Sequence, residues 1–219
     1  MQAPESLVIC AAGVGSRLGL DLPKCLVQIE GKPLIHHVLS ATRACKDVRV
    51  VVGFRETDVI AAVRDVRPDA LIVRNPNYRD TTNVDSLFLG SRGVRGRFIG
   101  LDGDVLINEV EFKRFLDLAS LEENLIAITP RRTDDAVSVE FDEEHGLVRS
   151  FRLPGREGDS FEWAGLASIE RVDPSLPGFF FRQLEPHLPT PAVIVECYEI
   201  DTEGDLAQAR RAARDFMAG

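Results

Sequence analysis

The sequence predicts a single α/β domain with a doubly wound, mostly parallel mixed sheet flanked by helices. Short apolar runs rich in β-branched residues alternate with amphipathic segments through the first half of the chain, and this strand and helix order is typical of a parallel sheet. A glycine-rich stretch directly follows the first apolar run, at the carboxyl end of a strand, where such sheets bind ligands. The 219 residues suffice for one large domain and would be cramped as two.

The first half of the chain supplies the alternating pattern. Residues 7–11 and 48–52 are β-branched runs that stop before glycine, and 70–73 is a third such run. Pro33 begins a helical stripe, and 58–66 is amphipathic with helical spacing. The segment from Thr81 begins the next helix, and we expect a fourth strand over 97–105.

The second half is predicted to continue the sheet. A helix over 109–120 leads to a strand over 124–129, and 137–141 with 147–153 form a hairpin around a polar turn. Further strands are expected over 161–169 and 192–195, with an aromatic-rich helix over 174–186 and a last helix over 207–217. Residues 153–160, rich in glycine and charge, are expected to form a loop.

Composition and charge narrow the classes of partner. The net charge is −9, so a polyanionic nucleic acid would be repelled. No apolar run approaches the roughly 18 residues of a membrane span, and residues 1–6 lack the parts of an export signal. We therefore expect a cytoplasmic protein with neither a nucleic acid nor a membrane as partner. The oligomeric state stays open, and a homodimer is compatible with the sequence.

The glycine-rich stretch has the composition of a phosphate loop. Gly13 and Gly15 let a ligand approach the backbone N–H groups closely, and Arg17 and Lys24 add two cations. Pro23 stiffens the chain before the lysine. Together these residues predict a clamp for a triphosphate.

Two common phosphate loops do not fit this stretch. A dinucleotide fingerprint needs a third glycine where Leu18 stands, and a Walker loop needs Ser or Thr after the lysine, where Cys25 stands. Cys25 is interpreted as a small buried hydrophobe, although Lys24 beside it would lower its pKa.

The stretch resembles the signature of nucleotidyltransferases that activate sugar phosphates and small phosphorylated alcohols. The matching segments are AAGVGSR at 11–17, PKCL at 23–26 and GKPL at 31–34. This resemblance implies a Rossmann-like, GT-A-like fold, with nucleotide binding in residues 1–105 and acceptor binding in 106–219. It implies catalytic roles for Arg17 and Lys24. It places the nucleotide against Ala11, Ala12, Gly13, Val14, Gly15 and Ser16.

Small polar residues at the start of the third helix have two interpretations. Thr82, Asn83 and Ser86 can cap the helix, or they can read a base beyond the strand ends. Asn75-x-x-Tyr78, Thr82-Asn83 and Ser86-Leu87-x-Leu89 resemble bacterial CTP:phosphocholine cytidylyltransferases and their phosphonate-using relatives. That resemblance implies CTP as the nucleotide, with Asn77 among the residues that bind it.

Three aspartates are candidates for metal binding. Asp104 matches the metal-binding aspartate of the family, and Asp201 matches its second ligand before the last helix. Asp201 can also act only as a helix cap. We expect only one of the two neighbouring carboxylates, that of Asp104, to face the ligand, with Asp102 as a helper on the nucleotide side. Mg²⁺ is the implied cofactor, since it prefers oxygen ligands shared with phosphates.

The acceptor side is less defined by the sequence. Arg131 and Arg132 follow the 124–129 strand and are interpreted either as part of a solvated turn or as ligands of the acceptor's phosphate or phosphonate, with Arg131 as the chosen candidate. Glu162 and Trp163 are interpreted either as a cradle for a cationic acceptor or as a core residue beside a surface acid. The tryptophan-containing segment that choline-specific relatives carry after the 124–129 strand is missing here, and this departure weakens the case for choline. The candidate acceptors are phosphocholine, an alkylphosphonate and an inositol phosphate.

The hypothesis from the sequence is a Mg²⁺-dependent transfer of CMP from CTP to a small phosphorylated or phosphonate acceptor. Such chemistry needs charge neutralisation and alignment more than a protein nucleophile. Two alternatives remain. One is a sugar-1-phosphate or molybdopterin-type nucleotidyltransferase, and the other is a nucleotide-sensing module without catalysis.

Overall fold

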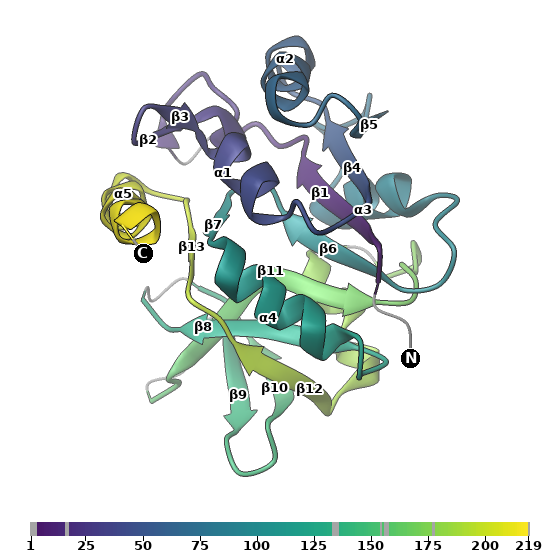
Figure 1. Cartoon of the computed structure of the whole chain (residues 1–219). Helices are drawn as coiled ribbons and strands as arrows, with labels where there is room; N and C mark the ends of the chain where they lie inside the picture. Colours follow the sequence, from purple (N-terminus) through teal and green to yellow (C-terminus); the bar gives the residue numbers. More distant parts are fainter. Residues whose placement is uncertain are drawn as a thin grey trace.

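The computed structural model describes residues 4–15, 18–132, 136–153, 155, 158–176 and 178–218. Its centre is a nine-stranded mixed sheet in the order β5-β4-β1-β6-β11-β8-β12-β10-β9, shown in Figure 1. The strands of this sheet are β1 Ser6–Ala11, β4 Asp47–Val52, β5 Leu71–Arg74, β6 Phe98–Asp102, β8 Leu125–Pro130, β9 Ser138–Asp142, β10 Leu147–Arg152, β11 Phe161–Ile169 and β12 Thr190–Ile194. The predicted single α/β domain with a mixed sheet is confirmed.

Parallel and antiparallel pairings divide the sheet. Strands β5, β4, β1 and β6 are parallel neighbours, whereas β11 runs antiparallel to β6 and to β8. Strand β9 pairs with β11 as well as with β10, so β11, β8, β12, β10 and β9 close into a ring. The parallel half carries the loops of the first 105 residues, and the ring is built from the second half of the chain.

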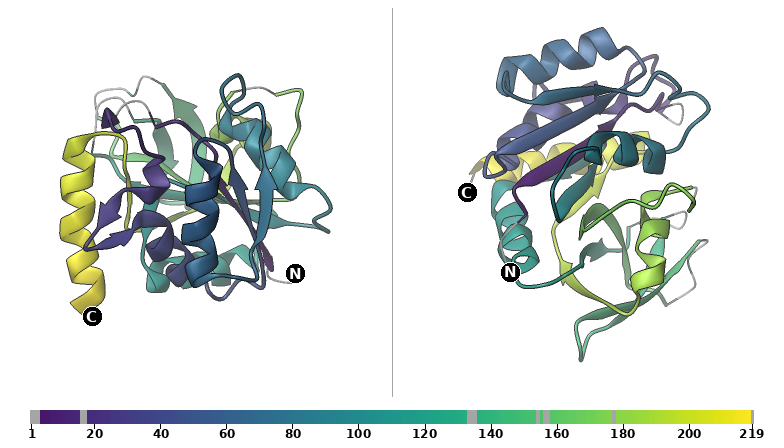
Figure 2. Two further views of the ribbon diagram at one scale, coloured as in Figure 1. Left: turned by 90° about the horizontal axis from the view of Figure 1, so that it is seen from above. Right: turned by 90° about the vertical axis from the view of Figure 1, so that its right-hand side faces the viewer.

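Helices cover both faces of the sheet, and the alternation along β1 shows why. Leu7 and Ile9 point into one apolar layer with α1 Leu34–Ala41, α2 Glu56–Val66, α4 Glu109–Ala119 and α5 Glu203–Ala218. Val8 points into the other layer, which contains α3 Asn83–Ser91 and the 3₁₀ turn η3 Phe180–Gln183. The two views in Figure 2 show the helices on either side of the sheet.

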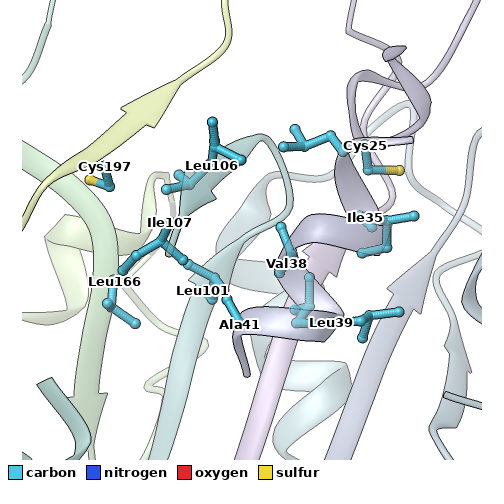
Figure 3. Close-up of a cluster of buried hydrophobic side chains, with 14 of the residues drawn as sticks. Cys25, Ile35, Val38, Leu39, Ala41, Leu101, Leu106, Ile107, Leu166 and Cys197 are labelled. Carbon is cyan, nitrogen blue, oxygen red and sulfur yellow. The ribbon is translucent and has the colours of Figure 1, made fainter. Parts of the chain in front are cut away.

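Two small sheets join distant parts of the chain. Strand β7 Val105–Ile107 pairs antiparallel with β13 Cys197–Glu199, and β2 Gln28–Ile29 pairs with β3 Lys32–Pro33. Figure 3 shows the apolar layer in which Leu106 and Ile107 of β7 and Leu101 of β6 lie near Val38 and Leu39 of α1. The 3₁₀ turns η2 Lys24–Leu26 and η4 Glu185–His187 complete the elements.

The fourth strand is shorter than the predicted 97–105. Strand β6 ends at Asp102, and β7 begins at Val105 in a different sheet. The N–H of Gly103 donates to the carbonyl of Cys10 at 2.9 Å, and a Cβ at Gly103 would lie 2.6 Å from that oxygen. Because glycine has no side chain, the chain can turn close against β1 at this position. The apolar pattern of the sequence did not indicate this turn.

The predicted helix over 174–186 is wrong. In the described part of this range, the structure has only the short turns η3 and η4. Gly178 has a φ of 114°, which lies outside the helical region. Pro186 has no N–H for a continuous helical ladder. Strand β12 begins at Thr190, two residues before the predicted start.

Among the described residues, no helix is long and apolar enough to cross a membrane.

Gly90 of α3 tests the contact between this helix and the sheet. A Cβ there would lie 2.4 Å from Cγ1 of Val8 and 2.8 Å from Cγ2 of Val51, so Gly90→Ala should lower the free energy of unfolding by about 1–3 kcal/mol through overpacking. Gly204→Ala in exposed α5 is the matched control, because its nearest atom would lie at 3.5 Å. The control should be neutral or stabilising by up to about 1 kcal/mol. Urea unfolding of both variants measures this, and equal stabilities would contradict the packing described.

Candidate active site

The glycine-rich loop leaves the end of β1 and folds back on Lys24. The carbonyl of Ala12 accepts a hydrogen bond from the N–H of Phe54 at 3.0 Å, and Gly53 has no room for a side chain beside that oxygen. Gly15 has a φ of +66° and lies against Lys24, whose Cγ would be 2.8 Å from an added Cβ. Glycine is therefore required at this position by both conformation and space. Ser16 and Arg17 lie outside the described residues.

Lys24 bridges two acids that come from distant parts of the chain. Its Nζ lies 2.6 Å from Oδ2 of Asp104 and also pairs with Oδ1 of Asp201. Asp104 follows β6, and Asp201 precedes α5. Burial favours the neutral amine, but the two carboxylates outweigh it and hold the pKa of Lys24 above its ordinary value. Lys24, Asp104 and Asp201 thus converge as the sequence predicted.

Asp102 and Asp104 line the same cavity, contrary to the expectation that only Asp104 would face it. Residues two positions apart share a face of an extended chain, so this spacing favours the observed placement, and the expectation was wrong. Burial, followed by repulsion from Asp104, raises the pKa of Asp102 to about 7, while the hydrogen bond from Asn83 opposes this shift. Gly165, with a φ of +68°, makes room for the Asp102 carboxylate in a bulge of β11, since an added Cβ would lie 3.3 Å from Oδ2.

Glu199 is a third acid at this place, and the sequence analysis missed it. Carboxylate oxygens of Asp104, Glu199 and Asp201 all lie within 4.8 Å of one another. Glu199 keeps solvent access, yet desolvation by surrounding protein and repulsion from Asp104 and Asp201 raise its pKa well above the ordinary value. A signal was present in the sequence, because Glu199 and Asp201 are two positions apart and extended residues at that spacing share a face.

The three carboxylates fit a divalent cation. All are hard oxygen donors, the ligand type that Mg²⁺ prefers. The ammonium of Lys24 already lies between two of them, which shows that the cluster accepts positive charge. One lysine offsets only part of the charge of three acids, so the arrangement can hold a metal and stabilise the charge of a bound polyphosphate.

Two cavities meet at this cluster. The first, of about 240 Å³, is lined by the glycine loop, Lys24 and the start of α3. The second, of about 340 Å³, is lined by β11, η3, β13 and α5. Four residues line both cavities: Asn83, Asp102, Phe179 and Glu199. Ligands in the two cavities would therefore face each other across the acidic cluster.

Most of the residues predicted to bind the nucleotide line the first cavity. These are Ala11, Ala12, Gly13, Gly15, Thr82, Asn83, Ser86 and Asp102. Val14 is not in this lining. Asn77 is exposed in the turn after β5, where its carbonyl accepts from the Thr81 hydroxyl at 2.9 Å.

The start of α3 combines capping with cavity lining. The backbone N–H and the hydroxyl of Thr82 both donate to Oδ2 of Asp85, at 2.8 and 3.0 Å. The Ser86 hydroxyl is buried and accepts from Nδ2 of Asn75 at 3.1 Å. These side chains therefore have structural partners in addition to any contact with a base.

On the acceptor side, the structure places Arg132 in the second cavity and does not place Arg131 there. Nη1 of Arg132 donates to Oγ1 of Thr129 at 3.0 Å and to the carbonyl of Cys197 at 2.9 Å. Its guanidinium carbon lies 4.2 Å from the ring centroid of Tyr198. The backbone N–H of Arg131 donates to Ser160 at 2.9 Å.

Glu162 and Trp163 both line the second cavity. Glu162 is buried, unlike the surface acid of one interpretation, and its Oε2 accepts from the N–H of Arg132 at 3.1 Å. Trp163 packs edge to face against Phe151 and Phe180, with centroids 6.0 and 5.3 Å away. Leu153, from the start of the predicted loop, lines this cavity too. Residues 154, 156 and 157 of that loop lie outside the described residues.

The thiol of Cys25 lies beside the site but is not set up as a nucleophile. Burial, with a smaller effect from Asp104, raises its pKa to about 12, so the thiol is protonated at neutral pH. The expectation of a small buried hydrophobe fits this environment.

Comparisons with known proteins identify the family to which this site and fold belong. A family model described as "MobA-like NTP transferase domain" matches residues 7–146. The chain is 48% identical over 80 residues to "Bifunctional protein GlmU" of Xanthobacter autotrophicus, a match that covers 36% of this chain and 18% of the relative. It is 30% identical over 149 residues to the protein of that name from Nitrosomonas europaea, covering 68% and 31%. The chain thus spans less than a third of the length of these relatives.

Solved structures share the fold at low sequence identity. HddC from Yersinia pseudotuberculosis complexed with GMP-PN has a TM-score of 0.77 at 19% identity, covering 95% of this chain and 99% of that one. The inositol-1-phosphate CTP transferase from T. maritima has a TM-score of 0.76 at 17% identity, covering 100% and 99%. The CTP:phosphocholine cytidylyltransferase LicC from Streptococcus pneumoniae has a TM-score of 0.74 at 18% identity, covering 95% and 98%.

Proposed function

The chain belongs to the MobA-like NTP transferase family, and from this premise we propose that it transfers CMP from CTP to a small phosphorylated or phosphonate acceptor. The nucleotide occupies the first cavity, and the acceptor occupies the second. Residues 1–105 then form the nucleotide-binding half and residues 106–219 the acceptor-binding half. Pyrophosphate is the second product.

The observation that carries the proposal is the position of the acidic cluster between the two cavities. Group transfer requires the acceptor oxygen to meet the α-phosphorus in line with the leaving group. Asp104, Glu199, Asp201 and Lys24 lie where ligands of the two cavities would meet. A nucleotide sensor without catalysis needs neither a second cavity at the cluster nor a lysine held among three acids, so this arrangement favours an enzyme.

The proposed step is a single displacement at phosphorus. An oxygen of the acceptor attacks the α-phosphorus of CTP, the bond to the oxygen bridging the α- and β-phosphates breaks, and that oxygen leaves with the pyrophosphate. Lys24 neutralises charge on the α-phosphate and the attacking oxygen, and Arg17 is proposed to hold the β- and γ-phosphates. Asp104, Asp201 and Glu199 would hold Mg²⁺, which supplies further neutralisation of the phosphates when bound.

The choice of cytosine as the base is supported by the residues that precede and begin α3. Asn75-x-x-Tyr78 and Thr82-Asn83 resemble the cytidylyltransferase motif, and two of the structural neighbours are named for CTP. A guanylyltransferase is the second candidate, because a neighbour of equal likeness was solved with GMP-PN. Tyr78, Thr81 and Ser86 line the cavity beside the proposed base position.

A pyrophosphate-release screen tests the proposal. It crosses CTP, GTP, UTP and ATP with phosphocholine, 2-aminoethylphosphonate and inositol 1-phosphate, with and without Mg²⁺. We expect turnover with CTP and Mg²⁺ and with one acceptor of this class. Turnover with GTP alone would replace CTP by the second candidate, and no turnover in any combination, with no nucleotide bound, would reject nucleotidyl transfer.

Lys24→Ala should reduce turnover by about two to three orders of magnitude, as expected on losing a donor to the transition state. Lys46→Ala is the matched control, because Lys46 is exposed and pairs only with Glu5 among the described residues. Pyrophosphate release by both purified variants measures the effect, with circular dichroism to confirm the fold. Near-normal release by the Lys24 variant would remove this lysine from the mechanism.

Arg132 is proposed to bind the anionic group of the acceptor. Its partners are two neutral oxygens and an aromatic face, so among the described residues its charge meets no carboxylate. Arg132→Met should raise the acceptor KM about ten- to a hundredfold, as expected for losing a hydrogen bond to a charged group. Arg131→Met should change the acceptor KM by less than about twofold, because Arg131 does not line the second cavity. The reverse order of the two effects would restore Arg131 as the acceptor ligand.

A further inference from the structure

The side-chain amide of Asn83 joins the two cavities. Its Nδ2 donates to Oδ1 of Asp102 at 3.1 Å, and its Oδ1 accepts from the backbone N–H of Phe180 at 3.0 Å. Phe180 is 97 residues away along the chain. The chemistry of the partners fixes the orientation of this amide, because the reverse orientation would place oxygen against a carboxylate and NH₂ against an N–H.

The segment that Asn83 holds is the aromatic wall of the second cavity, formed by Phe179, Phe180 and Phe181. Phe180 is buried, with its ring over Gly100, where an added Cβ would lie 2.5 Å from Cζ. Phe179 is 55% exposed and lines both cavities. Burial therefore fixes Phe180 more firmly than Phe179. The peptide between them has a local bond, from the N–H of Arg182 to the carbonyl of Phe179 at 2.9 Å, and the bond to Asn83 is a polar restraint that ties it to a distant part of the chain.

A residue that only reads a base would keep its amide free for the nucleotide. In Asn83 the carbonyl oxygen and one N–H already have partners within the protein. Asn75 is the matched amide on the nucleotide side. Its Nδ2 donates to the Thr81 and Ser86 hydroxyls at 2.9 and 3.1 Å. Asn75 lines neither cavity, but Thr81 and Ser86 line the first one.

We propose that Asn83 is a positioning residue that fixes the aromatic wall of the acceptor cavity relative to Asp102, in place of the base-reading role that the sequence favoured. It acts on the acceptor through the backbone of Phe180 and on the acidic cluster through the Asp102 carboxylate. The kinetic part of this inference rests on the proposed function, whereas the structural part does not.

Trp163 makes the wall observable without any substrate. It is the only tryptophan of the chain, and its ring packs on that of Phe180 with centroids 5.3 Å apart at 87°. Loosening the wall exposes this ring, so quenching of its fluorescence by acrylamide reports the restraint directly.

The experiment compares Asn83→Ala, Asn83→Asp and Asn75→Ala with the wild type. Asn83→Ala should raise the acrylamide quenching constant about twofold through local opening. It should raise the acceptor KM about tenfold through misplacement, while the dissociation constant for CTP with Mg²⁺ changes by less than about twofold. Asn75→Ala should weaken CTP binding and leave the quenching of Trp163 unchanged.

Asn83→Asp separates the two bonds of the amide. A carboxylate still accepts from the Phe180 N–H but cannot donate to Asp102. Repulsion between the two carboxylates works against the wild-type arrangement, so this variant should raise the quenching constant and the acceptor KM less than Asn83→Ala does, while kcat falls. It keeps the test open if the alanine variant does not fold. Calorimetry, fluorescence and the pyrophosphate assay supply the three readouts.

The inference is overturned if Asn83→Ala weakens CTP binding about tenfold or more while the quenching of Trp163 stays at the wild-type value. That result would make Asn83 a nucleotide ligand. If neither CTP nor GTP binds to the wild type, the proposed function fails, and the quenching of the two Asn83 variants still decides the structural part of the inference.

Discussion

The contact between the Lys24 ammonium and the carboxylates of Asp104 and Asp201 is the interaction on which the arrangement of the candidate active site depends. Asp201 is 177 residues from the lysine, so the contact joins the first and last parts of the chain. An ion pair that is only partly exposed contributes little net stability, because desolvation offsets much of its attraction. Its presence is better explained by function, since it keeps a group of acids together that would otherwise repel one another.

Close backbone approach makes this concentration of charge geometrically feasible. Gly53 lies against the carbonyl of Ala12, Gly103 lies against β1, and Gly165 lies against the Asp102 carboxylate. Each is a position where a side chain would push apart two segments that carry site residues. The apolar layers on both faces of the sheet then hold these segments in place, so the rigid part of the fold positions the polar part.

The sequence predicted local features well because local chemistry determines them. The first strand, the glycine loop and the cap at Thr82 follow from short-range patterns, and Lys24, Asp104 and Asp201 were found through a motif. Glu199 was missed because its position depends on the pairing of β13 with β7. Arg132 was ranked behind Arg131 because its position depends on the course of the chain after β8. The turn at Gly103 and the short turns around Phe180 also follow from long-range packing, which periodicity does not report.

The bonds of Asn83 illustrate the same limit at a single residue. Its place at the start of a helix indicated capping or base contact, and both are local interpretations. Its actual partners, Asp102 and the N–H of Phe180, come from two other parts of the chain. The residue type therefore indicated that the amide would form hydrogen bonds, and only the tertiary structure showed which groups are its partners.

The pairing of strand β11 limits how the two halves of the sheet can move. It pairs with β6 along one part of its length and with β8 and β9 along another, so one strand belongs to both the parallel half and the ring. A hinge motion between the halves would have to break backbone hydrogen bonds of that strand. The pairing of β11 therefore opposes rotation of the two halves as separate lobes, and it leaves the segments at the rims of the two cavities as the parts that can move without breaking the sheet.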